Sequence, residues 1–249
     1  MTRCLLLAFA LAVGCFAQDY KAGVARVNIT PKEPIWLSGY AARNKPSEGV
    51  GHPIWVKALA IEDGKGGRVV FVTADLIGLP RQFTDTVAAT LLKKYKLERS
   101  SLLFNVSHTH TGPVVWPNLT TMWDLPAAEV AVLRAYLAQL QEAYVQVVEA
   151  ALGKLEPVRL EYSVGSADFA VNRREFTPNG VKIGVNPQGP TDHSVPVLRA
   201  VRPNGGIVAI LFGYACHNTT LGANVYQLTG DYAGYAQTEL EKKYPGTQA

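Results

Sequence analysis

The sequence predicts an α/β fold in which helices flank a mixed β-sheet within a single domain. Short apolar runs bounded by turn residues alternate with longer segments whose apolar residues recur every three or four positions. The 249 residues are 48% hydrophobic and 18% charged, a composition that supplies one large core and excludes an intrinsically disordered chain. Glycine and proline are scattered rather than collected in a linker, so the sequence indicates no boundary between two domains.

The first elements are expected to be a β-hairpin, a helix and a strand. Apolar runs at 54–61 and 68–73 flank the turn residues 62–67, a pattern typical of an antiparallel hairpin, and hairpins make the sheet mixed rather than purely parallel. A strand is expected at 102–106. Apolar residues at a spacing of four predict a helix over 84–97, and they are Phe83, Val87, Leu91 and Tyr95.

The second half begins with the strongest helical pattern, at 127–152. One apolar stripe runs along this segment, Pro126 precedes it and Gly153 ends it. A last helix is expected at 232–244, where the chain almost ends. Because a strand normally follows a helix in this fold class, we expect the chain to be truncated at its C-terminus. Further strands are expected at 158–164, 197–201 and 207–212.

The N-terminal residues 1–17 have the pattern of a signal peptide. Arg3 precedes an apolar run that ends at Ala17, and this run is too short to span a bilayer of about 30 Å. We therefore expect residues 18–249 to be exported as a secreted or periplasmic protein. The alternative is a lipoprotein signal in which Cys15 is the lipidated residue.

Charge and cysteine content exclude two further classes of protein. The 24 basic and 20 acidic residues give a net charge of +4 without a basic block, so no nucleic-acid partner is expected. Removal of residues 1–17 would leave Cys216 as the only cysteine, which excludes a disulfide framework. We expect Cys216 to face the core from a strand.

Three of the five histidines follow predicted strands. His108 and His110 come directly after the strand at 102–106, and residues two apart on an extended chain point to the same side. His217 follows the strand at 207–212. Sites in α/β sheets form at strand ends, and imidazole nitrogens favour Zn²⁺ over Mg²⁺ or Ca²⁺. The pattern therefore predicts a zinc site, with hydrogen-bonded loop histidines as the alternative.

Three common hydrolase motifs are absent from the sequence. It contains no His-Glu-x-x-His of metalloproteases and no Gly-x-Ser-x-Gly nucleophile elbow. The His-x-His-x-Asp-His pattern of metallo-β-lactamase-like hydrolases fails as well, because Gly112 and Pro113 occupy the positions of its Asp and second His.

Seven short motifs occur between Gly23 and Tyr235. They are Gly23-Val24-Ala25-Arg26-Val27-Asn28-Ile29-Thr30-Pro31, Ser38-Gly39-Tyr40-Ala41, Thr73-Ala74-Asp75-Leu76, His108-Thr109-His110-Thr111-Gly112-Pro113, Asn172-Arg173, Ala215-Cys216-His217 and Gly230-Asp231-Tyr232-Ala233-Gly234-Tyr235. This ordered set resembles the N-terminal part of the catalytic domain of the neutral (non-lysosomal, neutral/alkaline) ceramidases, which are zinc-dependent amidases that cleave the fatty-acyl amide of ceramide.

The resemblance implies roles for four residues. His108 and His217 would be zinc ligands, His110 would act as an acid/base group or contact the oxyanion, and Arg173 would hold the substrate carbonyl or the product carboxylate. A Glu ligand, a Tyr ligand and the catalytic Ser are expected from a later part of the domain. The expected partner is a lipid amide substrate, together with peripheral contact with a membrane, and the oligomeric state is not specified.

Two other functions are alternatives to a zinc hydrolase. An exported metal- or ligand-binding protein on the same scaffold would bind without turnover, the fragment being inactive. A metal-dependent amidohydrolase barrel also uses His-x-His on a strand, but it needs several later histidines at strand ends, and only His217 is so placed.

The remaining candidate residues have structural interpretations. Asp231 is expected to be an N-cap of the last helix. Asp75 is expected either to orient a ligand histidine or to cap a turn. His52 and His193 lie in loops and are assigned to structure. The alternative for Arg173 is a solvated pair with its neighbour Arg174.

Overall fold

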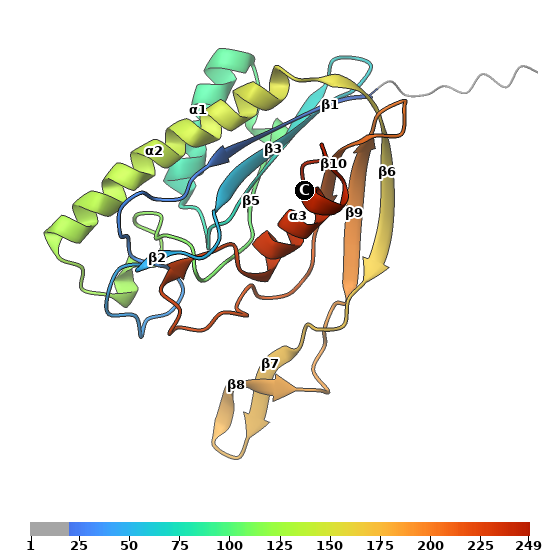
Figure 1. The fold of residues 1–249 in the computed structure, drawn as a ribbon. Helices are drawn as coiled ribbons and strands as arrows, with labels where there is room; N and C mark the ends of the chain where they lie inside the picture. Colours follow the sequence, from blue (N-terminus) through green and yellow to red (C-terminus); the bar gives the residue numbers. More distant parts are fainter. Residues whose placement is uncertain (1–19) are drawn as a thin grey trace, which may run out of the picture.

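A seven-stranded mixed sheet forms the centre of the computed structural model, which describes residues 20–249 (Figure 1). Strands β4 and β5 are parallel, and the other neighbouring strands are antiparallel. The predicted fold class is therefore confirmed, and a barrel of alternating parallel strands and helices is excluded. In spatial order the strands are β10 (Ile207–Phe212), β9 (Ser194–Val201), β6 (Glu156–Ser166), β1 (Tyr20–Asn28), β3 (Trp55–Glu62), β4 (Arg68–Ala74) and β5 (Leu102–Val106).

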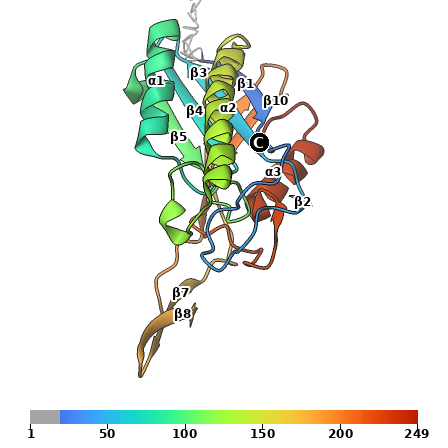
Figure 2. The ribbon, with the colours of Figure 1, turned by 90° about the vertical axis from the view of Figure 1, so that its left-hand side faces the viewer.

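Two long helices, α1 (Arg81–Tyr95) and α2 (Ala127–Leu152), cover one face of this sheet (Figure 2). Phe83 of α1 and Tyr144 of α2 meet edge to face, with ring centroids 5.0 Å apart, and both side chains are buried. Burying one such ring stabilises the fold by about 1.5–3 kcal/mol. The main core therefore lies between the helix pair and the sheet.

The sheet curls toward its other face, so that its two edge strands approach each other. Leu59 of β3 belongs to a second apolar cluster, against which Phe71 of β4 and Leu211 of β10 pack. Residues that follow β5 and residues of β10 line one hollow of about 300 Å³, although these strands lie at opposite edges of the sheet. The helix α3 (Asp231–Lys243) also lines this hollow. The curl thus brings the ends of β5 and β10 together.

Smaller elements complete the fold. The strands β2 (Gly49–Val50) and β11 (Gln227–Leu228) form a short parallel pair. The strands β7 (Asn172–Thr177) and β8 (Gly180–Asn186) form a hairpin that projects from the body of the molecule (Figures 1 and 2). Single 3₁₀ turns lie at Arg99–Ser101 and Thr120–Met122.

One face of the β7–β8 hairpin carries apolar side chains beside Arg174, which pairs with Ile183. Phe176 pairs with Val181 across the strands, and Ile183 lies two residues further along β8, so these three side chains share a face. Phe176 and Ile183 are 76% and 75% exposed. Residues of the other face form an ion pair, Glu175 with Lys182, at 3.5 Å. We call Phe176, Val181 and Ile183 the apolar hairpin face.

The predicted elements agree with the structure except at some boundaries. The hairpin of β3 and β4 and the bounds of α2 are confirmed. Helix α1 begins after Pro80 and ends before Lys96, whose left-handed conformation (φ 58°) closes its last turn, so the prediction of 84–97 was shifted. Helix α3 begins and ends one residue earlier than expected.

Strand β1 and the β7–β8 hairpin are not predicted by the sequence pattern. β1 includes Gly23, where the end of α2 packs so closely that a Cβ would lie 2.1 Å from the carbonyl oxygen of Ala151. The expected signal peptide lies outside the described residues. No helix within residues 20–249 is long and apolar enough to cross a membrane.

Candidate metal site

His108 lies two residues beyond β5, where the chain leaves the sheet. Its backbone is left-handed, with φ 58°. Its Nδ1 is 2.7 Å from the carbonyl oxygen of Ile77, and a carbonyl only accepts, so Nδ1 carries the proton and donates. Nε2 is then the nitrogen with a free lone pair. The ring is thus oriented as metal-binding histidines usually are, with its second nitrogen held by the protein.

His110 is 9% exposed and held on two sides. The Arg43 guanidinium donates to the backbone oxygen of His110 and to that of Ser38, each at 2.6 Å. Gly39 packs against the ring, and a Cβ at this position would lie 2.4 Å from Nδ1. Burial, and then the positive charge on the neighbouring imidazoles and on Arg43, lower the pKa of His110 to about 4.

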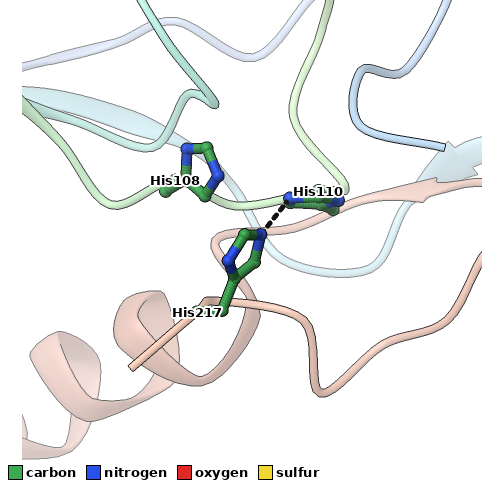
Figure 3. A group of neighbouring side chains, drawn as sticks. All are labelled: His108, His110 and His217. Carbon is green, nitrogen blue, oxygen red and sulfur yellow. Dashed lines mark hydrogen bonds between the residues drawn. The ribbon is translucent and has the colours of Figure 1, made fainter. Parts of the chain in front are cut away.

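His217 reaches the same point from the opposite edge of the sheet, five residues after β10 (Figure 3). Its Nε2 lies 2.8 Å from Nε2 of His110, within hydrogen-bonding distance. Its side chain is exposed, so the group is open to solvent on this side. Partial burial, and then the positive charge of Arg173, lower the pKa of His217.

The expected convergence of the three imidazoles is confirmed, but the expected extended backbone is not, because His108 is left-handed. One ring nitrogen from each of His108, His110 and His217 lies within 4.8 Å of the others. The ring centroids are 4.5 Å apart for His108 and His217, and 5.1 Å apart for His108 and His110. The lowered pKa values keep His110 and His217 neutral at pH 7, which is the form that binds metal.

The chemistry of this donor set fits zinc, which prefers imidazole nitrogen and thiolate ligands. One hydrogen bond joins His110 to His217, as the alternative of hydrogen-bonded loop histidines also requires. A measurement of metal content separates the two interpretations.

Arg173 lies on β7, at the base of the projecting hairpin. It lines a hollow of about 570 Å³ together with His217, Cys216 and Thr220. The structure therefore brings Arg173 to the solvent-open side of the histidine group. Its effect on the pKa of His217 is the electrostatic consequence of this position.

The predictions for Cys216 and Asp231 were wrong. Cys216 is half-buried and lines the hollow beside Arg173, because β10 ends at Phe212 and strand alternation no longer applies four residues later. The N-cap position of α3 is occupied by Gly230, which has no side chain to cap the helix. Asp231 is its first residue, and its carboxylate binds two amides of a neighbouring loop in addition to the Tyr232 amide.

Asp75 is bound to the backbone rather than to a histidine. Its carboxylate accepts hydrogen bonds from the Trp55 amide at 3.0 Å and from Gln237 Nε2 at 3.4 Å, so it joins β3 to α3. Burial raises the pKa of the Asp75 carboxyl. The Ile77 carbonyl takes the role of orienting His108.

His52 and His193 make the internal hydrogen bonds expected of structural residues. His52 Nε2 lies 2.9 Å from the Thr238 hydroxyl. His193 contacts Thr191 and the carbonyl oxygen of Ala167, each at 2.9 Å.

Three groups that shape the site had no assigned role in the sequence. Gly39 belongs to the motif Ser38-Gly39-Tyr40, so the sequence singled out this glycine, but it did not reveal the contact with His110. Arg43 lies outside every motif, and its hydrogen bonds to two carbonyl groups depend on the tertiary fold. The contact of Ile77 with His108 is made by its backbone carbonyl oxygen, so the type of residue at position 77 does not indicate it.

A family model described as neutral/alkaline non-lysosomal ceramidase, N-terminal, matches residues 20–249. Curated relatives include the neutral ceramidase of Pseudomonas aeruginosa, which is 24% identical over 252 residues, covering 97% of this chain and 36% of the relative. The neutral ceramidase of Drosophila melanogaster is 26% identical over 245 residues, covering 96% of this chain and 34% of the relative. The chain thus spans about a third of the length of these relatives.

Two solved structures share the fold. The crystal structure of the neutral ceramidase from Pseudomonas aeruginosa superposes with a TM-score of 0.77 at 22% identity, covering 93% of this chain and 38% of that one. A ceramidase complexed with C2 superposes with a TM-score of 0.78 at 23% identity, covering 93% of this chain and 37% of that one.

Proposed function

The chain belongs to the neutral/alkaline non-lysosomal ceramidase family, and from this premise we propose that it carries the histidine metal site of a zinc-dependent hydrolase. The proposed reaction is hydrolysis of a lipid amide of the ceramide type, in which water cleaves the acyl–nitrogen bond to give sphingosine and a fatty acid. The observation that carries the proposal is the meeting of His108, His110 and His217 at one solvent-open point.

We assign metal binding to two of the histidines and proton transfer to the third. His108 and His217 would hold Zn²⁺, which when bound supplies Lewis-acid chemistry that activates water for attack on a carbonyl carbon. His110 is neutral at pH 7 and would take up or return a proton beside the reacting carbonyl. Its burial and its contacts with Gly39 and Arg43 hold the ring in a fixed orientation for that transfer.

Arg173 would bind the oxygen atoms of the substrate. Its guanidinium offers a planar fork of donors that suits a developing oxyanion or the product carboxylate. Its place in one hollow with His217 supports this role over the alternative of a solvated surface pair with Arg174.

We also propose that the protein contacts a lipid surface through the apolar hairpin face. Phe176 and Ile183 are largely exposed, and the hairpin residues 172–186 carry Arg173, Arg174 and Lys182 against the single acid Glu175. An exposed apolar face beside basic residues is the combination that binds an anionic membrane surface.

A vesicle-binding experiment tests this contact. Phe176→Ser should weaken binding to phosphatidylserine-containing vesicles by about tenfold or more, since burying a Phe side chain contributes about 1.5–3 kcal/mol. The same substitution at Leu92, an exposed residue of α1, is the matched control and should leave binding unchanged. Equal binding by the Phe176→Ser variant and the parent would refute the contact.

Residues 1–17 are proposed to direct export, so that the mature protein acts outside the cytoplasm. Sequencing the N-terminus of the protein recovered from the producing cell would locate the cleavage site. An N-terminus at Gln18 is the expected result, whereas a lipidated Cys15 would support the alternative of a lipoprotein.

Hydrolysis of a fluorogenic N-acylsphingosine by the full-length protein tests the proposed function. His108→Ala and His217→Ala should each abolish hydrolysis and lower the zinc content, and His193→Ala should retain both because His193 lies outside the group. Zinc binding without hydrolysis would favour the second candidate, an exported binding protein without turnover. Full zinc content and full activity in either ligand variant would refute the assignment.

A further inference from the structure

Asp231 has an unusual position at the start of α3. Its side chain is completely buried, and its backbone is left-handed with φ 51°, a conformation that residues other than glycine adopt infrequently. Its carboxylate binds one amide in the first turn of its own helix and two amides of another segment. It accepts hydrogen bonds from the amides of Thr220 at 3.2 Å, Leu221 at 2.9 Å and Tyr232 at 2.5 Å.

Two of these donors belong to the loop that carries His217. The amides of Thr220 and Leu221 follow His217 by three and four residues. The Tyr232 hydroxyl donates to the carbonyl oxygen of Cys216 at 2.9 Å, directly before His217. Both sides of His217 are therefore attached to the first two residues of α3.

The other side of Asp231 is connected to the segment that carries His108 and His110. The Asp231 amide donates to the Thr229 hydroxyl at 3.0 Å, and this hydroxyl lies 2.7 Å from the hydroxyl of Thr111. The hydroxyl groups of Thr109 and Thr111 donate to the Thr229 carbonyl oxygen at 3.1 and 3.0 Å. All three threonines are buried.

The threonines alternate with the histidines along this segment. His108 and His110 contribute to the metal site, while Thr109 and Thr111 contact Thr229. One continuous buried network thus runs from the segment after β5, through Thr229 and Asp231, to the loop after β10.

We propose that Asp231 is a positioning residue that fixes the His217 loop relative to His108 and His110. It touches neither the metal site nor a substrate, and it acts by holding two backbone amides of the loop in place. The claim that this positioning aids metal binding rests on the proposed function. The claim that Asp231 positions the His217 ring does not.

The substitution Asp231→Asn tests the proposal with little change of shape. Asparagine tolerates the left-handed conformation, but one of its two terminal atoms is an NH₂ group, which cannot accept a hydrogen bond from a loop amide. We expect the affinity for Co²⁺, used as a spectroscopic probe, to fall about tenfold or more, with a changed absorption spectrum. Thr238→Ala is the matched control, because it removes one hydrogen bond of the same helix, to His52.

A second measurement makes the proposal independent of metal binding. In the chain treated with a chelator, the ¹⁵N resonances of the His217 ring should change in Asp231→Asn, because the 2.8 Å contact of its Nε2 with His110 Nε2 would be disturbed, and stay unchanged in Thr238→Ala. If Asp231→Asn does not fold, Thr229→Val removes one hydroxyl link of the same network and should lower the Co²⁺ affinity by about tenfold, the lower end of the range for outer contacts.

The outcomes distinguish the two proposals. Failure of the parent chain to bind Co²⁺ would count against the metal site, and the ring resonances would then decide the role of Asp231. Unchanged His217 resonances and unchanged Co²⁺ affinity in the folded Asp231→Asn variant, or in Thr229→Val, would overturn the positioning role.

Discussion

Replacing Gly39 with alanine should damage both the stability of the protein and its metal site. Gly39 has φ 98°, and an added Cβ would lie 2.4 Å from Nδ1 and 2.5 Å from Cγ of His110. Such distances are far inside van der Waals contact, so the backbone or the ring must move. The ring has little room to do so, because Arg43 holds the His110 carbonyl group and the side chain is buried.

The magnitude follows from two contributions. A left-handed conformation costs an alanine about 1–2 kcal/mol. Forcing a methyl group into a packed site costs a further amount of about 1–3 kcal/mol. The free energy of unfolding of Gly39→Ala should therefore fall by about 2–5 kcal/mol.

A second glycine separates these contributions. Gly205 has φ 88°, and no atom lies within 4 Å of the position that its Cβ would take. The free energy of unfolding of Gly205→Ala should thus fall only by the first contribution, about 1–2 kcal/mol. The difference between the two variants measures the collision with His110.

Urea unfolding followed by circular dichroism, together with Co²⁺ titration, measures both effects. Gly39→Ala should be less stable than Gly205→Ala by about 1–3 kcal/mol and should bind Co²⁺ more weakly. Gly205→Ala should bind Co²⁺ as the parent does. Equal stability and equal Co²⁺ binding of the two variants would show that the His110 ring is not packed on Gly39.

Three further predictions concern protons and metal. With metal removed, His110 takes up a proton near pH 6.5 in the unfolded chain but only near pH 4 in the folded chain, so protons favour unfolding between these values. The free energy of unfolding should therefore fall by up to about 3 kcal/mol as the pH drops from 6.5 to 4, and urea unfolding of His110→Gln should show a smaller loss. Arg173→Ala should raise the pKa of His217 in an NMR titration of the chelated protein, and Arg174→Ala should raise it less; no change in either variant would place both charges away from the ring. Removal of bound zinc should lower the midpoint of thermal unfolding, because a metal at 100 times its Kd stabilises by about 2.7 kcal/mol, and a chelator should have no such effect on His108→Ala.

Much of the fold was predictable because the strongest patterns are local. The apolar stripe of α2 and the turn between β3 and β4 depend on residues close in sequence, and both were predicted correctly. The position of β1 was not, because it depends on pairing with β3 and β6, which come later in the chain.

The candidate site was predictable in its residues but not in its construction. Placement after apolar strands identified His108, His110 and His217 as partners. That β5 and β10 form opposite edges of the sheet was not predictable, since it depends on the order of all the strands. The positioning of His217 by Asp231 was hidden as well, because Gly230-Asp231 before a helix is also the ordinary pattern of an N-cap.

The strand order also dictates when this site comes into being during folding. Its ligand segments follow the two outermost strands of the sheet, with five strands between them. Contacts between such remote segments require closure of a long loop and form slowly. The histidine group depends on a contact that spans 107 residues of the chain, so we expect it to assemble late in folding.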